Sequence, residues 1–231
     1  GLAAVVILTV GVVTWISLVF GGSGPPEARG RVIPYYTLIL LLVSGLTGLV
    51  FAADLFNVFV FLEVAALTGY ALVGASGGRA LLSAFRYLVL GSFGASLYLL
   101  GVSYLYAATG TLNMADLAQR LPELMSSTAV VSGLIFVFLG LAIKMALVPL
   151  HGWLPDAYAH ASESVSPILA STVTKVALVA WVRIFYSVVG PGIDVGHVPV
   201  LVLLDELGVA AALIGGTLAL RQTELKRMFA Y

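Results

Sequence analysis

The feature that most constrains this chain is a series of apolar runs, each long enough to cross a lipid bilayer as one helix. A membrane span needs about 20 consecutive, predominantly apolar residues. Seven segments meet or approach that length: Gly1–Phe20, Ile33–Ala53, Leu55–Ala75, Tyr87–Ala108, Ala129–Leu150, Val165–Val189 and Val198–Leu220. The last is the weakest, because Asp205 and Glu206 interrupt it. The sequence therefore predicts an all-α, polytopic bundle of about seven transmembrane helices, with the lipid bilayer as its solvent.

The composition agrees with this prediction and excludes several classes of protein. Of the 231 residues, 61% are hydrophobic and only 10% are charged, against roughly 45–50% and 25% in soluble domains. The mean hydropathy is +1.09. The net charge is zero, so the chain lacks the basic surface of a nucleic-acid-binding protein. These residues include no cysteine, which excludes disulfides, thiolate metal sites and cysteine nucleophiles among them.

Both ends of the chain suggest a piece of a longer protein. The first residue is Gly1, and the run to Phe20 has neither the basic start nor the small-residue cleavage site of a signal peptide, so we interpret it as a span. The last residue, Tyr231, follows directly on a basic cluster. We expect residues 1–231 to form a single, partial transmembrane domain.

The basic residues between the predicted spans indicate an orientation. Alternate connections place seven of them on one side: Arg29, Arg31, Arg79, Arg86, Arg221, Lys226 and Arg227. The other side has Arg120, with Arg183 close to it. Because positive residues favour the cytoplasmic side, we expect a multi-pass protein of the cell's inner (plasma) membrane. Its first residues would lie outside, and Tyr231 would lie on the cytoplasmic side.

Three charged residues lie at membrane depth on three different predicted spans: Glu63, Lys144 and Lys175. A lone charge there costs at least ~2.5–3.5 kcal/mol, so such residues usually face the bundle interior and find a partner. Burial lowers the pKa of a lysine and a neighbouring carboxylate raises it, so a buried lysine can exchange protons near neutral pH, which arginine cannot. The set could be a static ion pair that locks helices together. We favour a proton relay, and we expect the Glu63 carboxylate to lie within about 4 Å, directly or through one water, of Lys144 or another buried base.

The segment after Lys144 predicts an interrupted helix. Pro149 would remove the helical hydrogen bond to the carbonyl of Met145, and interrupted membrane helices are tolerated where they line protein or water. His151, seven residues after Lys144, would share its helical face. It could pass protons at the cytoplasmic mouth, or it could be a solvated interfacial histidine. We expect Lys144 and Lys175 to lie at similar depth and to point into one interior, with polar groups between them.

Two further sets of polar residues have alternative interpretations. Asp54 and Asn57 stand one turn apart at the start of the third predicted span, where Asp54 could cap the helix or the pair could mark where ions enter. Asp156, His160 and Glu163 have the i, i+4, i+7 spacing that could place three metal ligands on one helical face. The neighbouring Pro155 and the interfacial aromatic residues argue against that, and we predict no metal and no cofactor.

Five stretches resemble a known family when taken together: Asp54–Glu63, Phe85–Gly91, Ala108–Leu117, Lys144–Asp156 and Glu224–Tyr231. This is the antiporter-like family of proton-conducting membrane transporters. It includes the large subunits of multisubunit sodium/proton antiporters, the membrane subunits of respiratory complex I, and their counterparts in membrane-bound hydrogenases. The first and third stretches are most similar to the D-type large component of the multisubunit sodium/proton antiporter.

The resemblance implies a role for each charged residue. Glu63 matches the glutamate of the family's fifth helix, Lys144 the lysine of its broken seventh helix, and Lys175 the protonatable residue of the eighth. His151 falls in the run beyond the break. The family fold has about fourteen helices with two inverted five-helix repeats. This chain would hold one complete repeat, at about 33–189, and the start of the second, at about 198–231. The family's last charged helix would lie outside it.

The expected function is ion translocation by a subunit that has no redox centre of its own and is not an enzyme by itself. It would conduct protons through a relay of Glu63, Lys144, Lys175 and His151, with other membrane subunits as partners. Na⁺ is the candidate for the exchanged cation. A multisubunit cation/proton antiporter is our first interpretation. The alternative is a proton-pumping subunit of a complex I-like oxidoreductase or membrane-bound hydrogenase. A metal-dependent membrane enzyme and a structural scaffold are the competing classes.

Overall fold

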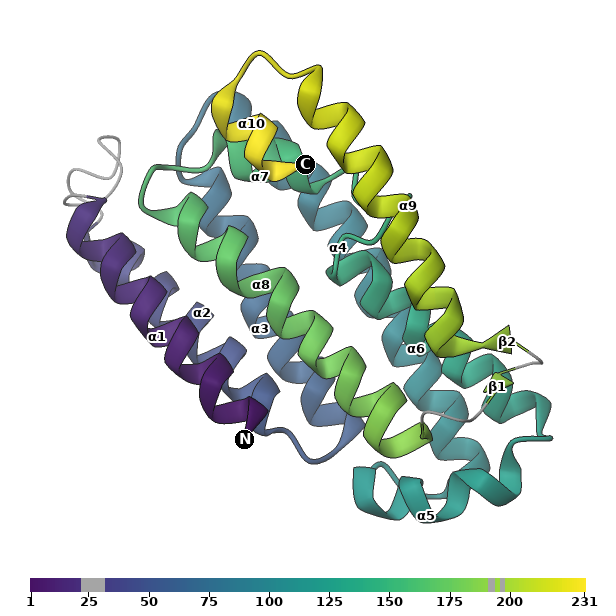
Figure 1. Ribbon diagram of the computed structural model, residues 1–231. Helices are drawn as coiled ribbons and strands as arrows, with labels where there is room; N and C mark the ends of the chain where they lie inside the picture. The colour runs from purple at the N-terminus through teal and green to yellow at the C-terminus, as the bar shows by residue number, and fades with distance from the viewer. Residues whose placement is uncertain (22–31, 191–193, 196–197) are drawn as a thin grey trace.

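The computed structural model describes residues 1–21, 32–190, 194–195 and 198–231, and it is a bundle of long helices that run alternately up and down (Figure 1). The long helices are α1 (Leu2–Phe20), α2 (Val32–Phe51), α3 (Leu55–Gly74), α4 (Arg79–Thr109), α6 (Thr128–Lys144), α8 (Val165–Val182) and α9 (Val200–Leu220). Arg29 and Arg31, two of the basic residues that predict the orientation of the chain, lie outside the described residues.

The predicted all-helical membrane fold is confirmed. Within the described residues, six helices are long and apolar enough to cross a membrane, namely α1 to α4, α8 with its π-helical continuation η2 (Arg183–Val189), and α9. Helix α9 forms although Asp205 and Glu206 interrupt its apolar run, and both side chains are exposed. The 17-residue α6 is the seventh apolar helix. Helix α4 begins eight residues earlier than expected, and its 31 residues span about 46 Å at 1.5 Å per residue.

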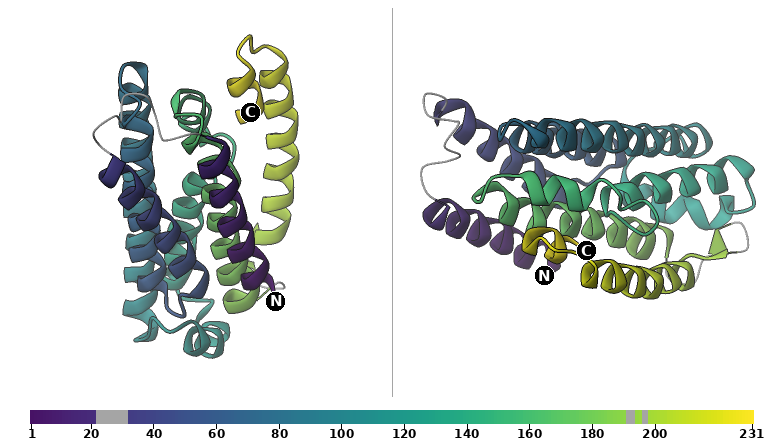
Figure 2. Two further views of the ribbon diagram at one scale, coloured as in Figure 1. Left: turned by 90° about the vertical axis from the view of Figure 1, so that its left-hand side faces the viewer. Right: turned by 90° about the horizontal axis from the view of Figure 1, so that it is seen from above.

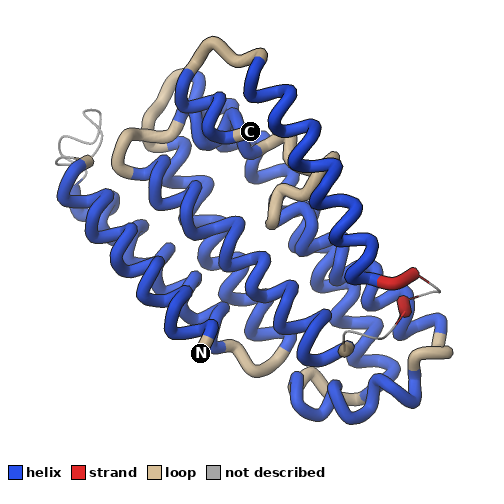
Figure 3. Tube along the Cα trace, in the orientation of Figure 1, coloured by secondary structure: helices blue, strands red, loops and turns tan. Residues whose placement is uncertain are grey.

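Short elements occupy the two ends of the bundle. Helix α5 (Met114–Leu124) runs across one end. The same end carries a two-residue hairpin, in which β1 (Asp194–Val195) pairs with β2 (Val198–Pro199) in antiparallel fashion. At the opposite end α7 (Leu154–His160) packs against α10 (Leu225–Ala230) (Figures 1 and 3). Both views in Figure 2 place α9 at an outer edge of the bundle. Only 11% of the residues in its most apolar 18-residue stretch are buried.

Glycines let α4 and α6 approach each other closely. A Cβ added to Gly101 would lie 2.6 Å from the carbonyl oxygen of Gly133, and one added to Gly140 would lie 2.6 Å from that of Gly94. The two glycines on each helix are seven residues apart, so they share one face. Small residues at such a seam replace the hydrophobic driving force that helices lack inside a bilayer. This contact holds α6, and therefore Lys144, against the bundle.

The expectation that this helix continues to Leu150 is wrong, because α6 ends at Lys144. Ala146 takes the left-handed conformation with φ 56°. Its N–H bonds to the carbonyl of Ile143 at 3.1 Å, and the N–H of Leu147 bonds to the carbonyl of Ala142 at 2.9 Å. These two bonds form a Schellman motif, which closes a helix by satisfying its last carbonyls. The interruption is therefore real, but it begins before Pro149.

Candidate functional site

The centre of the site is a buried ion pair between α6 and α3. Lys144, the last residue of α6, is only 6% exposed. Its Nζ donates to Oε1 of Glu63 at 3.0 Å, and the Glu63 side chain is 23% exposed. The predicted distance of under 4 Å is confirmed. A lysine placed at the end of a packed helix, opposite a carboxylate from another helix, is compensated electrostatically despite its burial.

Tyr70 is a third member of the site, which the sequence analysis missed. It stands seven residues after Glu63 on α3, so the two side chains share one helical face. The Lys144 Nζ lies 3.4 Å from the Tyr70 hydroxyl and 5.9 Å from the centre of its ring. Lys144 therefore meets two oxygen atoms from α3 at once. The seven-residue spacing between Glu63 and Tyr70 is the sequence signal that indicates Tyr70 as a member of this site.

An aromatic column connects Tyr70 to the helix break. The Tyr87 ring meets Tyr70 edge-on, with centroids 4.5 Å apart, and stacks on Trp153 at 4.1 Å with an interplanar angle of 2°. Trp153 Nε1 donates to the carbonyl of Ile143 at 3.1 Å. That carbonyl belongs to the residue before Lys144, so the column joins the side-chain environment of the lysine to the backbone that ends its helix.

Lys175 lies apart from this pair. It is exposed, and its Nζ donates to the carbonyl of Ala170 at 2.6 Å. The small pocket beside Lys144 is lined on the α8 side by Val173, Val176 and Ala177. The expectation that both lysines point into one interior with polar groups between them is therefore wrong for this chain. The helical geometry of α8 explains this, because residues 173, 176 and 177 share the face toward Lys144 and position 175 projects from the opposite side.

His151 lies on the turn that follows α6. The expectation that it shares the helical face of Lys144 is wrong, because α6 has already ended. His151 and Lys175 both line a cavity of about 310 Å³, which also contains Thr174, Tyr158 and Tyr231. Within the described part of the chain, the buried Nδ1 of His151 has no hydrogen-bond partner. Its ring meets Tyr231 edge-on, with centroids 6.2 Å apart.

Asp54 and Asn57 form a helix cap. Asp54 is the N-cap of α3, and one carboxylate oxygen accepts from the backbone N–H of Asn57 at 2.8 Å. The side-chain amide of Asn57 donates to the other oxygen. The capping interpretation is confirmed, and their role where ions enter stays a prediction.

Two of the three residues weighed as metal ligands, Asp156 and His160, have other partners, and Glu163 is exposed. Asp156 accepts from Arg86 of α4 at 2.9 Å and also from Arg227 of α10. The hydrogen bond to Asp156 raises the pKa of Arg227, so this guanidinium stays charged. The Nδ1 of His160 lies 2.9 Å from the hydroxyl of Ser83. In the ranges that the structure describes, no three His, Asp or Glu residues come together as a metal site.

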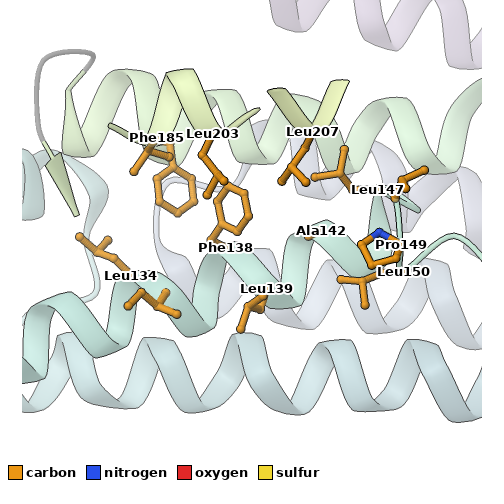
Figure 4. Close-up of a pocket in the computed structure, with 13 residues that line it drawn as sticks. Leu134, Phe138, Leu139, Ala142, Leu147, Pro149, Leu150, Phe185, Leu203 and Leu207 are labelled. Carbon is orange, nitrogen blue, oxygen red and sulfur yellow. The ribbon is translucent and has the colours of Figure 1, made fainter. Parts of the chain in front are cut away.

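A separate apolar cavity of about 380 Å³ lies between α6, the segment after it, and α9 (Figure 4). Phe138, Phe185 and Leu203 point into it from three different elements. Its lining contains no charged side chain, and Lys144 lines the other, smaller pocket. The charged residues therefore define the candidate site, and this cavity does not belong to it.

Comparisons with known proteins agree with the fold and the sequence motifs. Residues 52–231 match the transmembrane family described as NADH:quinone oxidoreductase/Mrp antiporter. NADH-quinone oxidoreductase subunit N of Desulforudis audaxviator is 46% identical over 93% of this chain and 43% of its own length. The D component of the Na⁺/H⁺ antiporter of Alkalihalophilus pseudofirmus is 33% identical over 85% of this chain and 39% of its own length.

A solved structure of a respiratory membrane complex contains a chain with the same fold. The chain superposes on a chain of the membrane-bound sulfane sulfur reductase, an archaeal respiratory membrane complex, with a TM-score of 0.89 and 36% identity. The match covers 99% of this chain and 46% of that chain. The chain thus spans less than half the length of the relatives it matches. The family match, the identity to both branches and the shared helical fold establish that this multi-pass membrane chain belongs to the NADH:quinone oxidoreductase/Mrp antiporter transmembrane family.

Proposed function

We propose that the chain is the ion-translocating part of a membrane subunit that moves protons through the Glu63–Lys144 pair. The observation that carries this proposal is the pair itself, a lysine 6% exposed at an interrupted helix and 3.0 Å from a carboxylate. A proton added to or removed from this lysine changes the charge of the pair inside the bundle. That change in charge is what couples proton movement to a conformational or redox event elsewhere in a complex.

We further propose that the complex is driven by a redox reaction. The relative named as part of an NADH-quinone oxidoreductase is 46% identical, and the relative from the antiporter is 33% identical. The superposed structure is also that of a respiratory complex. These relationships favour the redox-driven alternative of the sequence analysis over the cation/proton antiporter. In either case the partners would be other membrane subunits. In the redox-driven complex the electron carriers would belong to subunits other than this one.

Lys175 and His151 form a second titratable group in this proposal. Both line the cavity of about 310 Å³, whose polar groups could hold water. Because Val173 and Val176 stand on the Lys144 side of α8, a proton would have to pass around this helix, by way of the helix break, to reach Lys175. We therefore propose that the two lysines are successive stations and not a directly bridged pair.

The test uses the full-length protein within its assembled complex, in inverted membrane vesicles that carry a pH-sensitive dye. An electron donor, NADH or hydrogen, is supplied first, and Na⁺ is added to a second sample in which another pump has already acidified the vesicles. We expect donor-driven acidification, which Lys144→Ala abolishes while the complex remains assembled. Lys226→Ala, at an exposed lysine of α10, is the matched control and should pump normally.

The outcomes separate the candidate functions. Alkalinisation on addition of Na⁺, without any response to the electron donors, would show the antiporter and contradict the redox-driven proposal. Normal transport by the assembled Lys144→Ala protein would contradict the relay and favour a structural scaffold.

A further inference from the structure

The space occupied by the Tyr70 hydroxyl exists because residue 91 is a glycine. A Cβ built on Gly91 of α4 would collide with the Tyr70 hydroxyl and would lie 2.8 Å from Cζ and 3.2 Å from Cε1 of the ring. The collision involves the ring as well as its tip, so rotation of the hydroxyl alone cannot relieve it. Gly91 therefore provides the recess in which the hydroxyl end of Tyr70 is seated.

The rest of the surroundings prevents Tyr70 from taking another position. Its side chain belongs to a residue only 4% exposed, and Tyr87 packs against its ring with centroids 4.5 Å apart. Tyr87 is itself held by the stack on Trp153. A side chain placed at Gly91 would thus push the ring against neighbours that cannot move far, or away from Lys144.

The hydroxyl in this recess can serve Lys144 in both of its protonation states. A tyrosine O–H both donates and accepts. The charged ammonium donates to the hydroxyl oxygen across the observed 3.4 Å, and a neutral amine can accept the O–H instead. Glu63, as a carboxylate, can only accept. Glu63 alone therefore holds the charged lysine well and the neutral lysine poorly.

We propose that Tyr70, seated against Gly91, is a positioning residue that keeps the Lys144 amine beside Glu63 whether or not the amine carries its proton. The inference rests on the proposed proton translocation through Lys144. It adds a hydrogen-bonding partner that acts on the lysine and does not itself have to be ionised.

Two single variants and their combination test this in the full-length protein within its complex. Tyr70→Phe removes only the hydroxyl, and Gly91→Ala fills the recess. We expect each to slow proton translocation roughly ten-fold, the size of one hydrogen bond to a charged group, and to change the pH profile of the rate. The double variant should be no slower than the slower single variant, because both act on one contact.

Matched controls separate this effect from general disturbance. Tyr98→Phe removes another buried hydroxyl, one that donates to the carbonyl of Leu55 at 3.1 Å. Gly208→Ala adds a methyl group on α9, where its Cβ would meet nothing within 4 Å. Both controls should keep the wild-type pH profile. A Gly91→Ala protein that fails to assemble leaves the decision to Tyr70→Phe, whose ring still fits the recess.

Lys144→Ala, measured in parallel, distinguishes the possible failures. If it transports normally, the proposed function itself is wrong. If it is inactive while Tyr70→Phe keeps the wild-type rate and pH profile, the relay stands and the role of Tyr70 is overturned. Multiplicative losses in the double variant would likewise overturn the link between Tyr70 and Gly91.

Discussion

At the scale of single residues, the molecule depends on a charge pair that a bilayer interior would otherwise penalise. Removing one partner of a buried ion pair costs about 3–5 kcal/mol, because the other charge is left without compensation. The Glu63–Lys144 pair could be predicted from the sequence, since a lone acid and a lone lysine in apolar spans need each other. Tyr70 could not, because a tyrosine in an apolar helix is ordinarily a packing residue, and Gly91 acquires its role only once α3 and α4 are packed.

Glu63→Gln tests the electrostatic part of the pair. Glutamine keeps the size and an acceptor oxygen but removes the negative charge, so Lys144 binds its proton less tightly. We expect the pH optimum of proton translocation to move toward lower pH. The measurement is the initial rate in the dye assay between about pH 6 and 10.5, a window that contains the reference pKa values of histidine and lysine. Glu224→Gln, at an exposed position, should leave the optimum unchanged. An unchanged optimum in Glu63→Gln would show that its charge does not act on the lysine.

At the scale of elements, the end of α6 decides which residues meet. Pro149 predicts the interruption, but the apolar run predicts a helix end near Leu150. The actual end depends on the left-handed conformation of Ala146, which an alanine does not signal. His151 was misplaced for that reason, and Lys175 because position along a span gives its depth but not its rotation about the axis of α8.

Replacing Ala146 with glycine should stabilise this end of the helix. A left-handed non-glycine residue is strained by roughly 1–2 kcal/mol, and glycine at this position would relieve that strain. Part of the resulting gain in stability is offset by the greater freedom of glycine in the unfolded chain. We expect Ala146→Gly to raise the thermal unfolding midpoint of the detergent-solubilised protein slightly, with a gain of at most ~1 kcal/mol. A lowered midpoint would mean that the Schellman motif does not form as described.

The seam between α4 and α6 gives a second prediction. Gly101→Ala should lower the free energy of unfolding by the ~1–3 kcal/mol typical of overpacking, because the new methyl group would press on the Gly133 backbone. We expect this as a lower thermal unfolding midpoint. Gly208→Ala is the matched control: it lies on α9, and its Cβ would meet nothing within 4 Å. Equal midpoints for the two variants would contradict the close approach of α4 and α6.

At the scale of the whole molecule, the two ends of the bundle differ in charge and in construction. One end gathers Arg86, Asp156 and Arg227, which tie α4, α7 and α10 together. At the other, Arg183 donates to the carbonyls of Val50 and Ala52, at 2.7 Å each, and so closes the end of α2. The long apolar helices and their alternating direction could be predicted from hydropathy alone, whereas the short helices α5, α7 and α10 could not. These ties between distant segments could not, because they depend on packing.

Cysteine labelling tests the predicted orientation of the ends. In full-length protein without other cysteines, we expect Ser126→Cys to react with a membrane-impermeant maleimide in intact cells. Thr223→Cys should react only after permeabilisation, since the positive end is predicted to face the cytoplasm. Both positions are exposed, and Ser126 follows α5 while Thr223 precedes α10. Figure 1 shows α5 and α10 at opposite ends of the bundle. The reverse pattern would invert the assignment and place Tyr231 outside.

The central claim, that Lys144 carries a translocated proton, is tested most directly by Lys144→Arg in the full-length protein within its complex. Arginine keeps the positive charge and the ion pair with Glu63 but does not release its proton. The measurement is the initial rate of proton translocation per assembled complex in inverted vesicles. The account predicts a loss as complete as that of Lys144→Ala, with normal assembly. A rate close to that of the unaltered protein would contradict it and leave the Glu63–Lys144 pair as a static tie between α3 and α6.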